Sequence, residues 1–264
     1  MSEAQIVKTR YDSHPAALYL TISNVDAANS FTQEMFRQLI DYIKEANEDP
    51  SVRVIVLRGD GDRFFSSGLS MEMLDNIKTT DDKMMQWKLG KWAREAMAAS
   101  NKIIVSAVKG ACAGAGFELS LMADLIYASD KAKFVLPEFN IGLIPGCGGA
   151  LNLHKKIPYN RFFEMIMFCE RMKPEEGLKW GIINKVFPVD EFDAQVEELV
   201  KKLCERPPLS VKGFKELLRV QSTMGEDAAY RKEYDLSVDL MCTEDFKNAV
   251  KAFRAKESPV FQGK

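Results

Sequence analysis

The chain has 264 residues, of which 46% are hydrophobic and 28% are charged. This composition is ordinary for a soluble globular protein with a sizeable core, and it excludes a disordered chain and a small disulfide-stapled domain. The 36 basic and 38 acidic side chains leave a formal charge of −2. Since no global positive field would attract nucleic acid or an anionic membrane surface, we expect neither as a partner.

The cysteines and the N-terminal residues indicate the compartment. The five cysteines are widely spaced and contain no C-x-x-C pair, so the sequence predicts neither a disulfide framework nor a zinc site. The first ten residues lack an apolar signal region, and the longest uncharged stretch, 139–153, is interrupted by glycines and a proline. We therefore expect a cytoplasmic protein without a bound metal.

The first 110 residues alternate between strand-like and helix-like patterns. Short β-branched runs predict strands, and apolar residues at helical spacing predict amphipathic helices between them. In chain order, we expect strands at 6–9 and 16–22, a helix at 30–46, a strand at 52–59, a helix at 81–99 and a strand at 103–108.

Three glycine clusters lie after apolar runs of this pattern. They are F-F-S-S-G-L-S at 64–70, G-A-C-A-G-A-G at 110–116 and I-G-L-I-P-G-C-G-G at 141–149. Glycine permits sharp turns and close approach of the backbone to a ligand or to other chain segments. The clusters therefore predict loops that present backbone N–H groups.

The C-terminal third is dominated by helical patterns. A single strand is expected at 184–188, and amphipathic helices are expected at 190–204, 209–220, 228–241 and 243–256. The predicted fold class is α/β, with a core at residues 1–200 and a helical region at residues 201–264. The apolar faces of this region predict a surface for self-association.

Two glutamates stand out because of their apolar surroundings. Glu118 follows the second glycine cluster, and a continued helix would place Met122 and Leu125 on its face. Glu138 follows Pro137 within another apolar segment. Burial raises the proton affinity of a carboxyl, which suits general acid and base catalysis near neutral pH. The alternatives are a glutamate that serves only the first turn of a helix and a glutamate in an exposed turn.

Other catalytic chemistries lack their motifs. The two histidines, His14 and His154, have no metal-ligand spacing, and neither accompanies a G-x-S-x-G motif. The sequence contains no P-loop and no complete dinucleotide-binding motif. What the residues favour is acid and base chemistry next to backbone N–H groups, without a cofactor.

These residues resemble the crotonase superfamily, the enoyl-CoA hydratase and isomerase group, over nearly the whole chain. The matching segments keep the order and spacing of the family. They are N-S-F-T from Asn29, V-R-V-I-V-L-R-G from Val52, F-S-S-G-L-S from Phe65, I-I-V-S-A-V-K-G from Ile103, G-A-G-F-E-L from Gly114, A-D-L-I-Y-A-S from Ala123, P-E-F-N-I-G-L-I-P-G-C-G-G from Pro137 and F-R-A-K-E-S-P-V-F from Phe253.

The resemblance implies a fold and an assembly. The family fold is a right-handed spiral of ββα units, here residues 1–200 with the acyl-CoA site, followed by a helical oligomerisation region at 201–264. Family members form trimers, which commonly pair into hexamers. The implied partners are an acyl-CoA substrate and further copies of the chain.

The resemblance also implies a reaction. The thioester oxygen of the substrate would accept hydrogen bonds from the backbone N–H groups of Leu69 and Ala115. Hydratases of the family carry two glutamates, at positions that Glu118 and Glu138 match. They would handle the protons of a water that adds across the 2,3 double bond of an enoyl-CoA, and the N–H of Gly146 would help to hold this water.

Contacts to the coenzyme A portion follow from the same resemblance, and coenzyme A enters only as part of the substrate. Two departures affect these contacts, since Ser70 replaces a frequent aspartate and Glu72 stands where lysine is common. The residues expected to contact it are Arg63, Ser66, Ser67 and Gly68 in the core and Phe253 and Lys256 in the tail, where the last two would reach a neighbouring subunit.

Two further functions stay open. A double-bond isomerase of the same family would need only Glu138, and a non-catalytic acyl-CoA binding scaffold would need neither glutamate. The acyl group is also open, because the segment 75–92, which would line its pocket, indicates only an apolar and adaptable surface with several methionines.

Overall fold

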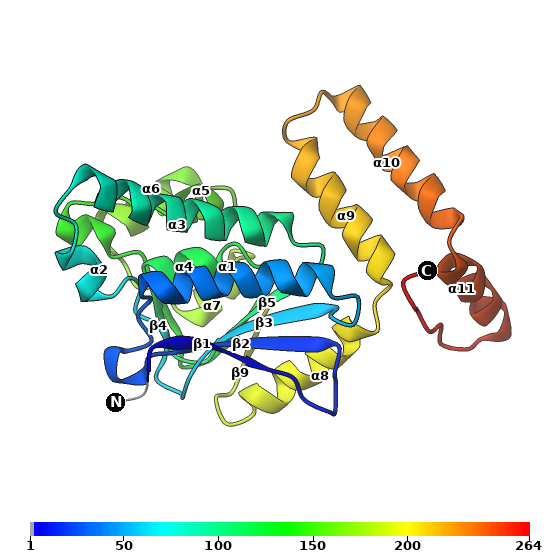
Figure 1. Cartoon of the computed structure of the whole chain (residues 1–264), viewed down its shortest axis with the longest axis horizontal. Coiled ribbons are helices and arrows are strands. Elements are labelled where there is room, and N and C mark those ends of the chain that lie inside the picture. The colour runs from blue at the N-terminus through cyan, green and yellow to red at the C-terminus, as the bar shows by residue number, and fades with distance from the viewer. Residues whose placement is uncertain (1–2) are drawn as a thin grey trace.

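The computed structural model describes residues 3–264, and its centre is a six-stranded sheet (Figure 1). The strand order is β1-β2-β3-β5-β7-β9, and every neighbouring pair is parallel except β1 with β2. The bounds of these strands are β1 Gln5–Thr9, β2 Ala17–Ser23, β3 Val54–Gly59, β5 Ile103–Val108, β7 Leu125–Ser129 and β9 Lys185–Phe187.

A second sheet has three short parallel strands in the order β4-β6-β8. They are β4 Phe64–Ser66, β6 Ala111–Ala113 and β8 Lys133–Val135. From β3 to β8 consecutive strands alternate between the two sheets, which confirms the predicted spiral of ββα units. The sequence pattern did not predict these three strands, because three residues are too few to show an alternation.

Helices cover both faces of the large sheet, and the alternation of side chains along each strand separates two cores. Leu18 and Leu20 of β2 pack in the core that includes α1 and α3, whereas Tyr19 packs in the core under α8. The helices of this part are α1 Gln33–Glu48, α2 Met71–Asp75, α3 Thr80–Ala99, α4 Ala115–Ser120, α5 Gly149–His154, α6 Tyr159–Met167, α7 Pro174–Lys179 and α8 Phe192–Cys204, with 3₁₀ turns η1 Val25–Ala27 and η2 Glu138–Ile141.

Helix α4 is shorter than the sequence suggested. It ends at Ser120, and Leu125 begins β7, so Glu118 does not share a helical face with Met122 and Leu125 as expected. The reason is tertiary, because Asp124 is bonded to β5. The N–H of Asp124 donates to the carbonyl of Ile104 (2.9 Å), and its carboxylate accepts from the N–H of Ile104 (2.7 Å).

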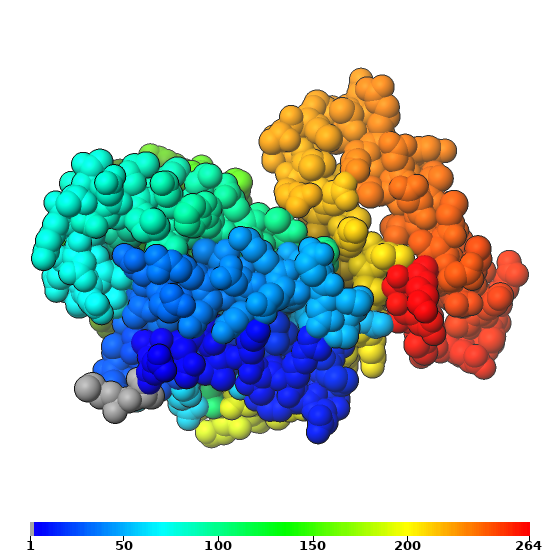
Figure 2. Space-filling view, viewed as in Figure 1, coloured from blue at the N-terminus to red at the C-terminus, as the bar shows by residue number. Residues whose placement is uncertain are grey.

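Three helices at the C-terminus project away from the two-sheet core (Figures 1 and 2). They are α9 Pro208–Gln221, α10 Glu226–Met241 and α11 Glu244–Ala255. The predicted border at residue 200 falls inside α8, where Val200 is fully buried against the large sheet. The projecting region therefore begins at Pro208, and it exposes large apolar side chains such as Phe214, Tyr234 and Phe253.

A partly exposed ion pair joins this projecting region to the core. Lys215 of α9 donates to the carboxylate of Asp124 (2.5 Å) and to the carbonyl of Lys102 (2.7 Å). Desolvation lowers the pKa of Lys215, although the charge of Asp124 opposes this effect. Asp124 also accepts a hydrogen bond from the N–H of Ile104 in β5. The ion pair therefore connects the C-terminal helices to β5, the strand that leads into the second glycine cluster.

The part of the chain that the structure describes contains neither a membrane-spanning helix nor a metal-binding cluster. No helix in that part of the chain combines the length and the apolar character that a membrane span requires. Over residues 3–264, no group of three or more His, Cys, Asp or Glu side chains is arranged to hold a metal ion.

The two neighbouring segments that lead from the large sheet to the small one, 60–63 and 109–110, lie in close contact, and this contact generates a prediction about Gly110. A Cβ at this position would lie 2.2 Å from the carbonyl oxygen of Arg63, which is backbone and cannot move aside. We expect Gly110→Ala to lower the free energy of unfolding by about 2 to 4 kcal/mol, as measured by urea denaturation. Gly213→Ala is the control, because a Cβ there would meet only leucine side chains, at 3.8 Å and 3.9 Å. Equal stability of both variants would contradict the tight backbone contact.

Candidate active site

Two glycine turns, one after each of two short strands, lie against each other. Gly68 follows β4 and Gly114 follows β6, and both have left-handed backbone angles, with φ of +106° and +50°. A Cβ on Gly68 would be 3.4 Å from the backbone nitrogen of Ala115. The parallel pairing of β4 with β6 therefore brings the segment of Leu69 next to the first residue of α4.

The backbone N–H groups of Leu69 and Ala115 donate no hydrogen bond within the described part of the chain. The N–H of Phe31 donates to the carbonyl of Gly68 (2.7 Å), and the carbonyl of Phe31 accepts from the N–H of Ser70 (2.9 Å). Because Leu69 lies between Gly68 and Ser70 in this extended segment, its own N–H points away from Phe31. Ala115 is the first residue of α4, where an N–H has no partner inside the helix. Among residues 3–264 neither N–H meets a hydrogen-bond acceptor.

Ser66 supports the first of these turns from inside. Its side chain is fully buried, and its hydroxyl accepts a hydrogen bond from the N–H of Gly68 (3.1 Å). A Cβ on Gly116 would lie 2.6 Å from the Cβ of Ser66, so glycine is required for this packing. Ser66 as a whole has no exposed surface, so in this structure it supports the turn from inside, and its predicted contact with coenzyme A stays a prediction.

Glu118 is held by a loop from the third glycine cluster. Its side chain is 2% exposed, and Oε1 accepts hydrogen bonds from the N–H groups of Cys147 and Gly149, both at 2.8 Å. A Cβ on Gly149 would lie 2.3 Å from Cγ of Glu118, so only glycine fits there. Burial raises the pKa of Glu118, while the N–H groups of Gly149, Cys147 and Gly146 act in the opposite direction.

Glu138 approaches the same turn from the other side. It begins η2, and its Oε1 is 3.2 Å from the position that a Cβ on Gly114 would take. Its Oε2 is buried without a hydrogen-bond partner in the described part of the chain. Burial, followed by the nearby charge of Glu118, raises the pKa of Glu138 to about 7, although its own N–H acts in the opposite direction.

The structure thus gathers the residues that sequence analysis singled out for chemistry. Leu69, Ala115, Glu118 and Glu138 meet around Gly114, and Gly146 lies in the loop beside Glu118. Whether Gly146 holds a water stays a prediction, since its N–H faces the carboxyl of Glu118 itself.

The residues predicted for coenzyme A are more dispersed. Ser67 is exposed beside the first turn, and Arg63 is exposed with its guanidinium over the ring of Phe64, 5.6 Å from the centroid. Phe253 and Lys256 belong to the end of α11, far from α2 and α4 in the same chain (Figure 1). Within a single chain they do not reach the two glutamates.

Sequence reasoning missed the residues that fix Glu118. The donors Cys147 and Gly149 lie 29 and 31 positions from Glu118 in the chain. Gly90 of α3 adds to this arrangement, because a Cβ there would lie 2.8 Å from Sγ of Cys147. The dense glycines at 146–149 were the one signal available, and they indicated a backbone site without identifying its ligand.

Comparisons with known proteins agree with this architecture. Residues 13–264 match the family model described as enoyl-CoA hydratase/isomerase, and the chain belongs to this family. It is 34% identical over 248 residues to a carnitinyl-CoA dehydratase from Shigella flexneri, covering 91% of this chain and 90% of that protein. A carnitinyl-CoA dehydratase from Proteus mirabilis is 31% identical over 245 residues, covering 90% of this chain and 92% of that protein.

A solved structure extends the likeness to three dimensions. An enoyl-CoA hydratase from Polaromonas sp. JS666 superposes with a TM-score of 0.91 at 25% sequence identity, covering 97% of this chain and 99% of that one. The fold is therefore that of the crotonase superfamily, and the chain is a hydratase or dehydratase type of enzyme in that family.

The raised pKa of Glu138 predicts how stability varies with pH. Its pKa of about 7 in the folded state lies above the ordinary 4.5, so its stabilising contribution is complete below pH 4.5 and is lost as the pH rises through 7. Glu138→Gln cannot ionise, so its stability relative to wild type should rise between pH 5 and pH 8. We expect a gain of about 1 to 2 kcal/mol, since solvent screens part of the charge.

Urea denaturation at several pH values measures this difference. Glu233→Gln, at an exposed position of α10, is the control and should differ from wild type by a constant amount. A difference between Glu138→Gln and wild type that does not change with pH would show that Glu138 ionises normally in the folded protein.

Proposed function

We propose that this protein is an enoyl-CoA hydratase, which reversibly adds water across the 2,3 double bond of an enoyl-CoA to give a 3-hydroxyacyl-CoA. The observation that carries this proposal is the meeting of two carboxyls with raised pKa values beside two backbone N–H groups that donate no hydrogen bond among residues 3–264. Addition of water needs a base for the water, an acid for the carbon and stabilisation of the enolate between them.

The two N–H groups supply the enolate stabilisation. In the proposed complex the thioester oxygen accepts hydrogen bonds from Leu69 and Ala115, whose turns already lie in contact. Negative charge grows on this oxygen when water attacks Cβ, so the hydrogen bonds strengthen in the transition state. Each donor of this kind typically contributes about 3 to 4 kcal/mol.

The different surroundings of the carboxyls assign their roles. Glu118 accepts two backbone hydrogen bonds on Oε1, which favours its charged form and suits the base that deprotonates the water. Glu138 has a buried oxygen without a donor and a pKa of about 7, so its protonated form is available to deliver a proton to Cα. In the dehydration direction the two residues exchange roles.

The relatives support a hydration chemistry and leave the acyl group to be proposed. By their name, the carnitinyl-CoA dehydratases remove water from carnitinyl-CoA, and removal of water from a CoA thioester is the reverse of the type of reaction proposed here. Isomerisation of a 3-enoyl-CoA by Glu138 alone is the competing function, and the hydrogen bonds that hold Glu118 favour hydration over it. The substrate panel for this protein should therefore contain short, long, branched and cyclic enoyl-CoA thioesters, together with carnitinyl-CoA.

Substitution of either glutamate tests the mechanism. We expect Glu118→Gln and Glu138→Gln each to lower the turnover of the best enoyl-CoA substrate by about 10²- to 10⁴-fold, because each removes one proton transfer. Loss of absorbance at the conjugated thioester double bond measures hydration. Glu95→Gln, on the exposed surface of α3, is the control and should retain full activity.

The same variants separate the alternatives. Conversion of a 3-enoyl-CoA by Glu118→Ala at the wild-type rate would replace hydration with isomerisation as the principal activity. Undiminished hydration by either glutamine variant would refute the roles given above.

We also propose that the chain assembles into a trimer or a hexamer through α9, α10 and α11. These helices expose Phe214, Tyr234 and Phe253, apolar side chains that a second copy of the chain would cover. Assembly would also bring Phe253 and Lys256 of a neighbouring copy to the coenzyme A portion of the substrate, since within one chain they lie far from α2 and α4 (Figure 1).

Light scattering coupled to gel filtration tests this assembly. With a chain mass of 29.8 kDa, we expect a particle of three or six times that mass. Tyr234→Glu should reduce the mass toward the monomer and raise the KM for the thioester, because a charge on this apolar face opposes its burial. A monomeric wild-type protein with full activity would contradict the proposed assembly.

A further inference from the structure

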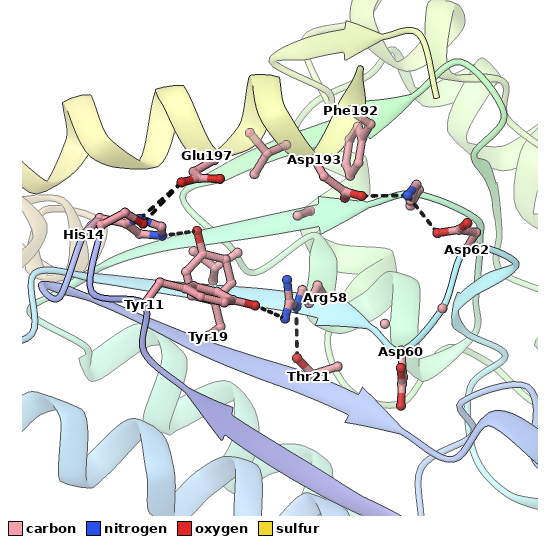
Figure 3. A pocket seen from close by; sticks show the side chains of 17 residues that line it. Tyr11, His14, Tyr19, Thr21, Arg58, Asp60, Asp62, Phe192, Asp193 and Glu197 are labelled. Atoms are coloured by element: carbon pink, nitrogen blue, oxygen red, sulfur yellow. Dashed lines mark hydrogen bonds and ion pairs between the residues drawn. The ribbon is translucent and has the colours of Figure 1, made fainter. Parts of the chain in front are cut away.

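A cavity of about 570 Å³ lies on the side of the large sheet that α8 covers (Figure 3). Its floor is formed by side chains of β2, β3 and β5, and its wall by the first turns of α8. None of Leu69, Ala115, Glu118 and Glu138 lines it. Its volume falls in the range of small-molecule sites, and it lies where the parallel strands end, a frequent place for ligands in α/β proteins.

Arg58 lies at the centre of this cavity and is held in place by neutral groups (Figure 3). Its Nε donates to Oγ1 of Thr21 (3.0 Å), and its Nη2 donates to the hydroxyl of Tyr11 (2.7 Å). The guanidinium also stands over the ring of Tyr19, 5.0 Å from the centroid. These contacts fix the orientation of the guanidinium without neutralising its charge.

The charge of Arg58 is unpaired in the described part of the chain. No carboxylate of residues 3–264 forms an ion pair with it, and its Nη1 donates no hydrogen bond there. Lys109, the other cation of the cavity, differs, because Asp62 and Asp193 both contact its Nζ at 2.7 Å. A half-buried guanidinium with a free edge is suited to bind a carboxylate through two parallel hydrogen bonds.

The rim of the cavity carries the opposite charge. Asp62 and Asp193 have side chains that are 74% and 75% exposed, and they share a single lysine. Asp60 and Glu197 also line the cavity, and Glu197 pairs with Lys201 (3.2 Å). The rim therefore keeps a net negative charge, which would repel a polyanion such as a phosphate and attract a cationic group.

The interior between these two regions carries no further cation near neutral pH among the described residues, and its lining mixes polar and apolar side chains. Val56, Ala107 and Phe192 are buried there, and His14 is also buried, with Nε2 2.9 Å from the hydroxyl of Tyr19. Desolvation lowers the pKa of His14, although the charge of Glu197 opposes this, so the imidazole does not add a second interior cation near neutral pH. Arg58 is thus the single unpaired cation that faces the interior among the described residues.

We propose that this cavity binds a small zwitterion, whose carboxylate pairs with Arg58 and whose cationic nitrogen lies among the carboxylates of the rim. The ring of Tyr11, which lines the cavity and is 37% exposed, would contact the carbon chain of the ligand. This binding site lies on the opposite side of the sheet from the two glutamates and does not depend on the proposed hydratase function.

Calorimetric titration with matched probes tests the proposal. The probes are the ω-amino acids from glycine to 6-aminohexanoate, with the carboxylic acid and the amine of the same chain length as comparisons, and inorganic phosphate. We expect at least one ω-amino acid to bind at least tenfold more tightly than its matched acid and its matched amine. Absence of binding by the whole series, or tighter binding of an amine or of phosphate, would overturn the proposal.

Variants locate the binding in the cavity. Arg58→Gln should lower the affinity for the preferred ω-amino acid at least tenfold. Tyr11→Phe removes only the hydroxyl that accepts a hydrogen bond from Arg58, so it should lower this affinity less. Asp62→Asn combined with Asp193→Asn should abolish the preference over the matched acid. Unchanged affinity in both Arg58→Gln and Tyr11→Phe would overturn the site, and a cooperative urea-denaturation curve for each variant shows independently that it has folded.

Discussion

The burial of Glu118 against backbone N–H groups is the interaction on which the rest of the site depends. A desolvated carboxyl without donors would be strongly destabilising, and the loop that carries Cys147 and Gly149 supplies two donors at 2.8 Å. This arrangement requires a glycine at 149, because any side chain there would overlap Glu118. The hydrogen bonds from Cys147 and Gly149 to Glu118 join the third glycine cluster to α4. Helix α4 begins at the turn that presents the N–H of Ala115.

The two carboxyls differ because their hydrogen-bond environments differ. Both are withdrawn from solvent, which raises both pKa values, but only Glu118 receives backbone hydrogen bonds from another segment. The charge of Glu118 then raises the pKa of Glu138 further, so Glu138 keeps its proton to a higher pH than an exposed glutamate does. A pair of this kind provides an acid and a base at the same pH, which is what a reversible addition of water requires.

The large sheet supports two sites because its side chains alternate between faces. One face of β2 and β3 packs toward α1 and the glycine turns, where the proposed hydratase site lies. The opposite face carries Tyr19, Val56 and Arg58, and α8 covers only part of it, so a cavity is left at the strand ends. The strands that position the catalytic turns therefore also build the proposed zwitterion site.

The sequence by itself determined the alternation of strands and helices, the helical C-terminal region and the two glutamates, because these depend on local periodicity and local composition. It missed β4, β6 and β8, whose three residues each acquire strand geometry only by pairing with one another. It also extended α4 too far, since the bonds between Asp124 and Ile104 that end the helical segment join residues 20 positions apart. Only the tertiary structure decided that Cys147 and Gly149 hold Glu118 and that Arg58 meets no acidic partner among residues 3–264. Such contacts arise between segments whose spacing along the chain carries no periodic signal.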